Sequence, residues 1–232
     1  LAKGMVKAAK DAGVAVVSGE IAELGARVGG FGRYNYNWGG TVLSIVRKEL
    51  SGRGVKPGNR IVALEEKGFR SNGISLVRKI MEQAYGPNWH TQKKGARTLG
   101  DLALTPSRIY SRAALKMFDD AKGIAHITGG GIPGKLGRLL AAKKLGAEIA
   151  DPFPPCPLML HCQELGGVKD AEAYQAWNMG QGMLIITGRP EKIISIARDH
   201  GIEAKVAGKI TAGPGLTITS RGYYSPGKPL SF

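Results

Sequence analysis

The stretch Ala125-His126-Ile127-Thr128-Gly129-Gly130-Gly131-Ile132-Pro133 contains the strongest structural pattern in this sequence. Its first part, residues 125–128, predicts a short strand, and the three consecutive glycines that follow predict a tight turn. Residues 135–142 predict a helix after that turn. The order of strand, turn and helix is typical of a chain with mixed α and β layers.

The rest of the chain continues this alternation. Strands are expected at residues 14–17, 41–47, 60–64, 183–187 and 202–210. Helices are expected at residues 1–13, from Ser71-Asn72-Gly73 to Met81 with Ser71 or Asn72 as the cap, from Pro106 onward with Ile109, Ala113 and Met117 on one side, and at 190–200 before Gly201. Residues 25–40 and 85–101 are expected to be loops, and residues 151–157, with four prolines, an irregular segment. We therefore expect an α/β protein in two parts, residues 1–50 and 51–232.

The composition indicates a globular protein with an affinity for anions. The 232 residues are 43% hydrophobic, and 33 Lys plus Arg against 18 Asp plus Glu give a formal net charge of +15. The densest basic cluster, Lys93, Lys94 and Arg97, has no aromatic pattern of an RNA-binding module beside it, so a nucleic-acid partner is not expected. No apolar run reaches the roughly 18–20 residues of a membrane span, and no signal peptide is visible. A cytoplasmic protein without a membrane partner is expected.

The two cysteines, Cys156 and Cys162, are too few for a disulfide framework. His161 lies between them in the sequence, but no second Cys or His pair at zinc spacing is nearby, so a metal site here is only weakly indicated.

The glycine run has two physical interpretations. Glycines let the backbone approach a phosphate closely, and Lys135 and Arg138 on the following helix add positive charge. Alternatively, the glycines only provide the backbone conformations of a sharp turn. His126 beside the run is either a polar ligand contact or a structural histidine.

Several other polar residues are open to both a binding and a structural role. Glu20 and Glu23 are three residues apart, which on a helical turn places both carboxylates on one side, either for Mg²⁺ or to complement the helix dipole. Arg108 either clamps a phosphate or pairs with a carboxylate. Asn72 and Asn178 either contact a ligand or fix a cap and a turn.

Five stretches together resemble one enzyme family, and the resemblance covers essentially the whole chain. They are residues 18–24 (SGEIAEL), 71–80 (SNGISLVRKI), 105–110 (TPSRIY), 125–133 (AHITGGGIP) and 177–183 (WNMGQGM). In this order they resemble aminoimidazole ribonucleotide synthetase, also called phosphoribosylformylglycinamidine cyclo-ligase. The resemblance implies two α/β domains, of which this chain holds part of the N-terminal, ATP-binding and dimerising domain and all of the C-terminal one. The family's acidic and glycine-rich nucleotide-binding segment is expected upstream of Leu1.

The resemblance also implies a function, cofactors and site residues. Members of the family are expected to be cytoplasmic homodimers that act in purine biosynthesis. They use ATP and Mg²⁺ to close the ring of formylglycinamidine ribonucleotide. The family places substrate or phosphate contacts at Ser71, Asn72, Gly73, Arg108, His126, Thr128, Gly129, Gly130, Gly131 and Asn178, and metal or ATP contacts at Glu20 and Glu23.

Three positions depart from the family pattern. Arg70 stands where the family has a histidine, and an arginine cannot exchange a proton near neutral pH. Asn37 and Asn59 stand where the family tends to have acids, which weakens a metal role there. The leading hypothesis is a cyclo-ligase. Its alternatives are another enzyme of the wider superfamily and a divergent relative that binds a nucleotide or phosphorylated ligand with different or no catalysis.

Overall fold

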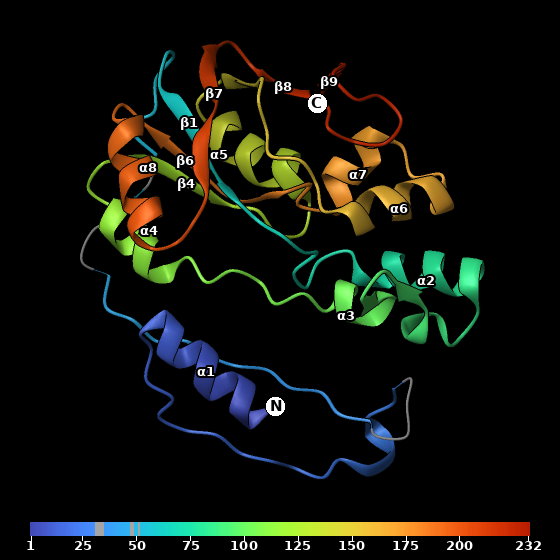
Figure 1. Ribbon diagram of the computed structural model, residues 1–232. Coiled ribbons are helices and arrows are strands. Elements are labelled where there is room, and N and C mark those ends of the chain that lie inside the picture. The colour runs from blue at the N-terminus through green and yellow to red at the C-terminus, as the bar shows by residue number, and fades with distance from the viewer. Residues whose placement is uncertain (31–34, 47–48, 51) are drawn as a thin grey trace. The chain divides into compact units, whose positions relative to one another are not determined.

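The computed structural model describes residues 1–30, 35–46, 49–50 and 52–232. The chain divides into two compact units, Leu1–Glu49 and Leu50–Phe232, which are described separately (Figure 1).

In the N-terminal unit, the described residues form one α-helix, α1 (Ala2–Ala12), which confirms the first predicted helix. It ends at Gly13, whose left-handed backbone lets its N–H donate to the carbonyls of Ala9 and Lys10. A single 3₁₀ turn, η1 (Gly25–Arg27), follows.

The two strands predicted in this unit are wrong for its described residues. Residues 14–17 and 41–46 form no strand, and Arg47 lies outside the described part. An extended segment needs a neighbour to pair its backbone N–H and C=O groups. Val17 and Ile45 are each 90% exposed, so these segments also lack a core to pack against.

The C-terminal unit is built on a seven-stranded sheet with the order β4-β6-β1-β7-β5-β8-β9 (Figure 1). The strands are β1 (Arg60–Glu65), β4 (Ala121–His126), β5 (Leu145–Ile149), β6 (Gln181–Thr187), β7 (Ala204–Ala212), β8 (Gly215–Thr219) and β9 (Pro229–Ser231). Neighbours are antiparallel except β5 and β8, which are parallel. Four predicted strands are thus confirmed with shifted ends, and the mixed α/β fold class is confirmed.

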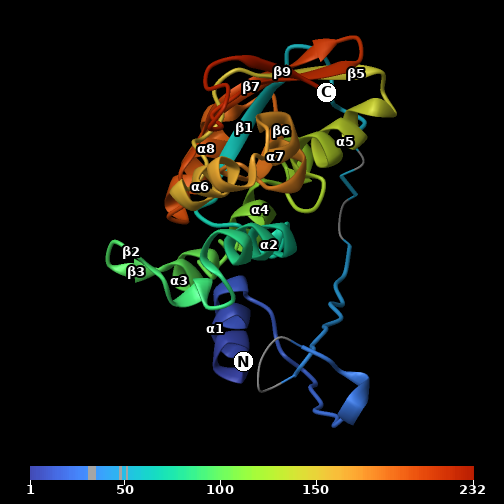
Figure 2. The ribbon, with the colours of Figure 1, turned by 90° about the vertical axis from the view of Figure 1, so that its right-hand side faces the viewer.

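Helices cover both faces of this sheet (Figures 1 and 2). Along β1, Ile61 and Ala63 belong to one hydrophobic core, and Val62 and Leu64 belong to the other. This alternation is the period of two expected of a strand buried on both faces. The smaller core is closed by α4 (Ser111–Met117) and α8 (Pro190–Asp199). The larger core includes residues from α2 (Ile74–Tyr85), α3 (Leu99–Ala103), the π-helical turn η3 (Pro133–Gly137), α5 (Arg138–Ala141), α6 (Pro157–Gly166) and α7 (Asp170–Ala176).

Several predicted helix boundaries need correction. Neither Ser71 nor Asn72 caps α2, because the cap is Gly73 in a left-handed conformation and no side chain bonds there. The helix expected from Pro106 begins only at Ser111, and Ile109 precedes it. The predicted helix at residues 135–142 is η3 followed by α5.

The loop expected at residues 85–101 is partly regular. It contains the 3₁₀ turn η2 (Trp89–Thr91), a hairpin of β2 (Lys93–Lys94) and β3 (Arg97–Thr98), and the start of α3. Thr98 and Asp101 form a reciprocal capping box on α3. The spacing of these two residues is visible in the sequence and marks the start of this helix.

A buried carboxylate fixes the C-terminal loop to α7. Asp170 is 3% exposed and accepts hydrogen bonds from Gln163 (2.9 Å), the Ser220 hydroxyl (2.6 Å) and the backbone N–H groups of Tyr224 (3.0 Å) and Ser225 (2.9 Å). Four donors around one carboxylate satisfy it without a cation.

Among the described residues, no helix combines the length and the apolar character needed to cross a bilayer.

Candidate functional site

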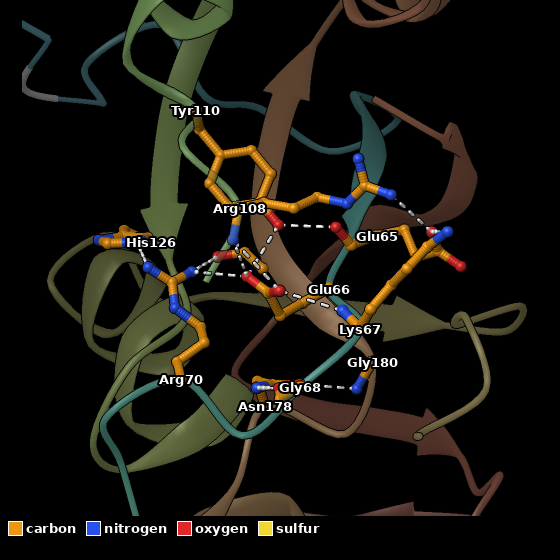
Figure 3. Close-up of polar contacts among 11 residues, drawn as sticks. Glu65, Glu66, Lys67, Gly68, Arg70, Arg108, Tyr110, His126, Asn178 and Gly180 are labelled. Carbon is orange, nitrogen blue, oxygen red and sulfur yellow. Dashed lines mark hydrogen bonds and ion pairs between the residues drawn. The ribbon is translucent and has the colours of Figure 1, made fainter. Parts of the chain in front are cut away.

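The strand register brings the ends of β1 and β4 to one edge of the sheet. In β6, Met183 pairs with Leu64 of β1 on one side and with His126 of β4 on the other. Since β6 is antiparallel to both, β1 and β4 run in the same direction and end together. The segment of residues 66–70 that follows β1 therefore reaches the end of β4, where Arg70 lies beside His126 (Figure 3).

Glu66 is the buried acceptor at the centre of this cluster. It is 2% exposed, and its carboxylate accepts hydrogen bonds from the backbone N–H groups of Lys67 (3.0 Å) and Arg108 (3.3 Å) and from the Tyr110 hydroxyl (3.2 Å). These bonds tie the segment before α4 to the end of β1.

Tyr110 packs tightly against the start of β6. Its hydroxyl also donates to the Glu65 carbonyl (2.6 Å), and burial together with the Glu66 charge raises the pKa of Tyr110 far above its ordinary value. A Cβ at Gly182 would lie 1.9 Å from the Tyr110 hydroxyl. Packing therefore requires a glycine at position 182.

Arg70, which the resemblance places at a histidine position, is fixed on several sides. One guanidinium nitrogen lies 3.6 Å from Glu66 Oε2 and donates to the Gly182 carbonyl (3.3 Å). The guanidinium carbon lies 5.6 Å from the centre of the Tyr110 ring. The other terminal nitrogen contacts His126 Nε2 (Figure 3). Arg70 and His126, both singled out in the sequence, are brought into direct contact.

The environment of His126 disfavours its charged form. Partial burial of the ring, the Arg70 charge and the Lys135 charge together lower the pKa of His126 below its ordinary value. These surroundings therefore favour the neutral imidazole.

Arg108 pairs with a carboxylate, which is one of its two predicted roles. Its guanidinium donates to Glu65 Oε2 (3.3 Å) and to the Gly201 carbonyl (3.0 Å). Its Nε is the buried side-chain polar atom without a hydrogen-bond partner in the described structure. Each terminal nitrogen thus makes one hydrogen bond within the protein, and the role of Arg108 as a phosphate clamp stays a prediction.

Two of the three glycines after β4 have backbone conformations that require glycine, and Gly129 does not. Gly130 (φ 86°) and Gly131 (φ 58°) have left-handed backbones, and the Gly131 N–H donates to the Thr128 carbonyl (2.9 Å). A Cβ at Gly131 would lie 1.8 Å from the Tyr174 carbonyl oxygen. The turn therefore requires both residues.

Gly129 is different, because its φ is not positive and the turn does not require a glycine there. It is exposed, and the nearest atom to an added Cβ is Asn72 Oδ1 at 3.5 Å, an ordinary contact. The structure thus brings Asn72 and Gly129 together at the surface, next to exposed Ser71 and half-buried Thr128.

The side chain of Asn178 bonds to backbone groups of the protein itself. It is 3% exposed, its amide donates to the Gly68 carbonyl (2.8 Å), and its oxygen accepts from the Gly180 N–H (2.9 Å). Gly73 is also confined, since a Cβ there would lie 2.4 Å from the Trp177 ring. These two predicted contact residues shape the site by holding the loop of residues 66–73 against the loop before β6.

The predicted metal ligands do not form the expected arrangement. Glu20 and Glu23 are exposed in a segment without helix, so the helical turn that was to align them is absent. Among the described residues, no group of three or more His, Cys, Asp or Glu side chains could hold a metal ion. The metal and ATP roles of Glu20 and Glu23 stay a prediction from the resemblance, without the helical turn expected to align them.

Asn37 and Asn59, for which the resemblance predicts acids, differ in setting. Asn59 is 7% exposed and its side-chain oxygen accepts from the Lys56 N–H (3.0 Å), so it closes the turn before β1. Asn37 is exposed in the N-terminal unit.

Burial disfavours the thiolate form of both cysteines. Both are free, and burial raises the pKa of Cys162 to about 12 and also raises the pKa of Cys156. His161 instead bonds to the Tyr85 hydroxyl (2.7 Å).

Comparison with known proteins identifies the family. The model described as "AIR synthase related protein, C-terminal domain" matches residues 56–221. The chain belongs to this family. It is 37% identical over 216 residues to the phosphoribosylformylglycinamidine cyclo-ligase of Methanococcus maripaludis strain C7, covering 90% of this chain and 60% of the relative. It is 34% identical over 230 residues to that of Methanopyrus kandleri, covering 96% of this chain and 65% of the relative.

A solved structure supports the AIR synthase related fold. The E. coli hydrogenase maturation protein HypE is similar with a TM-score of 0.51 and 17% identity, covering 82% of this chain and 54% of HypE. At that identity the likeness concerns the fold alone. The chain spans about 60% of the length of the first cyclo-ligase relative, so the function of the whole protein is a matter for proposal.

Proposed function

We propose that this chain is the larger part of an ATP-dependent cyclo-ligase that converts formylglycinamidine ribonucleotide to aminoimidazole ribonucleotide in purine biosynthesis. The observation that carries the proposal is the cluster at the ends of β1 and β4, where Glu66, Arg70 and His126 meet beside the exposed glycine loop. Family membership supports the same activity, because the named relatives are cyclo-ligases.

The reaction explains why such a site is useful. An amide oxygen is a poor leaving group, and its phosphorylation by ATP allows an amidine nitrogen to displace it as phosphate. Both the ribonucleotide and the phosphorylated intermediate are anionic, so the protein must position negative charge. In this chain, Gly129 and Gly130 are exposed, and Asn72 lies next to Gly129. The cations Arg70 and Lys135 lie near His126, which precedes the same loop, so polar groups and positive charge gather there.

The remaining elements of the proposal come from the family. We include in it the assignment of residues 1–50 to an ATP-binding and dimerising domain, the homodimer, Mg²⁺ and the cytoplasmic location. Since Glu20 and Glu23 do not form the expected pair, no catalytic step of this chain is assigned to the metal.

A second candidate is a divergent relative that binds the ribonucleotide or another phosphorylated ligand without this catalysis. The observation that favours it is Arg70, whose guanidinium can donate hydrogen bonds but cannot exchange a proton as a histidine does.

The test is production of ADP and aminoimidazole ribonucleotide from ATP and formylglycinamidine ribonucleotide, using the protein with any residues that its gene encodes before Leu1. Substrate-dependent ADP with one equivalent of aminoimidazole supports the ligase. Saturable ribonucleotide binding without product supports the divergent relative, and turnover gained by Arg70→His identifies that residue as the cause.

A further inference from the structure

The contact between Arg70 and His126 determines which nitrogen of the imidazole carries a proton. A guanidinium has only donors and stays protonated in proteins. The ring atom it contacts is Nε2, which must therefore be the acceptor. A neutral imidazole that accepts at Nε2 carries its proton on Nδ1.

We propose that Arg70 is a positioning residue that holds His126 as the neutral tautomer protonated on Nδ1, so that this histidine cannot take up a proton through Nε2. The site is thereby one of fixed donors suited to an anionic ligand, with His126 excluded as a general base.

Arg70 is held firmly enough to impose this state. The side chain of Arg70 is 10% exposed, and the side chain of Glu66, whose carboxylate faces it, is 0% exposed. The Gly182 carbonyl and the Tyr110 ring contact the same guanidinium. Its backbone lies in the left-handed region (φ 63°), a strained conformation for a non-glycine residue that persists only when its surroundings fix it.

The charges that face His126 act in the same direction. Arg70 follows β1 and Lys135 lies on η3, and both cations oppose a positive charge on the imidazole. The Glu66 carboxylate lies on the far side of this contact, paired with the guanidinium of Arg70. Partial burial of the ring also favours the neutral form, and the pKa of His126 is lowered.

The consequence for chemistry rests on the proposed function. In ring closure, the attacking amidine nitrogen must lose a proton. If His126 is fixed as proposed, that proton passes to another group, such as the departing phosphate, and His126 contributes only through its position and its Nδ1–H.

The test is long-range ¹H–¹⁵N NMR on the full chain labelled with ¹⁵N-histidine. The chain has four histidines, and the signals of His126 are those lost in His126→Gln. We expect the Nε2 resonance of an unprotonated nitrogen and the Nδ1 resonance of a protonated one at neutral pH, with titration below the ordinary histidine range. A predominant Nε2–H tautomer, or titration at the ordinary pKa, overturns the proposal.

Two variants separate the role of Arg70 from that of charge alone. Arg70→Met removes the donor, so His126 should shift toward a mixture of tautomers and its pKa should rise. Lys135→Met removes a nearby cation without touching Nε2, so the pKa should rise while the Nδ1–H tautomer remains. An unchanged tautomer in folded Arg70→Met contradicts the proposal; if that variant does not fold, the wild-type spectrum still decides. These results do not depend on turnover, so a failure of the ligase assay and a failure of this assignment are distinguishable.

Discussion

The three glycines after β4 allow a test that separates a turn from a ligand site. Alanine at Gly130 faces only the left-handed backbone, because the nearest atom to its Cβ is Gly134 Cα at 3.4 Å. Alanine at Gly131 faces the same strain and a carbonyl oxygen 1.8 Å away. Alanine at Gly129 faces neither, since its φ is not positive and the nearest contact is 3.5 Å.

These differences set the expected stabilities. Gly130→Ala should cost about 1–2 kcal/mol from the left-handed backbone. Gly131→Ala should cost about 2–5 kcal/mol, because the overlap with backbone adds to that strain. Gly129→Ala should be neutral or stabilise by about 0.4–1 kcal/mol through the unfolded chain. Each kcal/mol corresponds to about 2–4 °C in Tm for a unit of this size, which thermal unfolding followed by circular dichroism resolves.

The same three variants test the anion site through ribonucleotide binding by calorimetry. If Gly129 is a glycine because a phosphate approaches the backbone there, Gly129→Ala should keep its Tm and weaken binding at least tenfold. Two results refute the reasoning. One is a Gly129→Ala variant as unstable as Gly131→Ala, and the other is a stable variant that binds like the wild type.

Three further predictions concern stability. Asp170→Asn should lower the free energy of unfolding by about 2–5 kcal/mol, because an amide leaves two of four buried donors without an acceptor. Urea unfolding measures this loss, with the exposed Asp199→Asn as the control. Equal losses in the two variants would contradict the prediction. Tyr110→Phe should cost about 1–3 kcal/mol by removing the donor to the Glu65 carbonyl, again by urea unfolding, and a neutral result would count against this bond. Because the pKa of His126 is lowered from 6.5, the unfolded chain binds its proton at higher pH than the folded chain, so stability falls as pH drops below about 6.5. When the pH is lowered from about 7.5 to 5, the Tm of His126→Gln should therefore fall less than the Tm of the wild type. Parallel plots of Tm against pH for the two proteins would contradict this.

The sequence predicts the centre of the fold well. The stretches at 61–64 and 183–186 are continuous apolar runs, and both form central strands buried on two faces. Residues 14–17 are also apolar, and residues 41–46 are rich in β-branched side chains, but neither forms a strand in the described structure. Strand formation depends on a pairing partner that local sequence does not specify.

The site is predicted only in part for a similar reason. Arg70 and His126 are identifiable from family motifs, but their contact depends on the register of β1, β6 and β4. Glu66 is missed, because its partners Arg108 and Tyr110 are 42 and 44 residues away in the sequence. The structural roles of Asn178 and Gly182 likewise depend on distant residues that pack against them.

The most direct test of the proposed site is amide NMR of the full chain titrated with formylglycinamidine ribonucleotide. The account predicts saturable shifts at Asn72, His126, Gly129 and Gly130, with no shifts at the comparable exposed turn of residues 213–215. Saturable binding that leaves the loop after β4 unperturbed, or no binding at all, would contradict the assignment of this edge of the sheet as the substrate site.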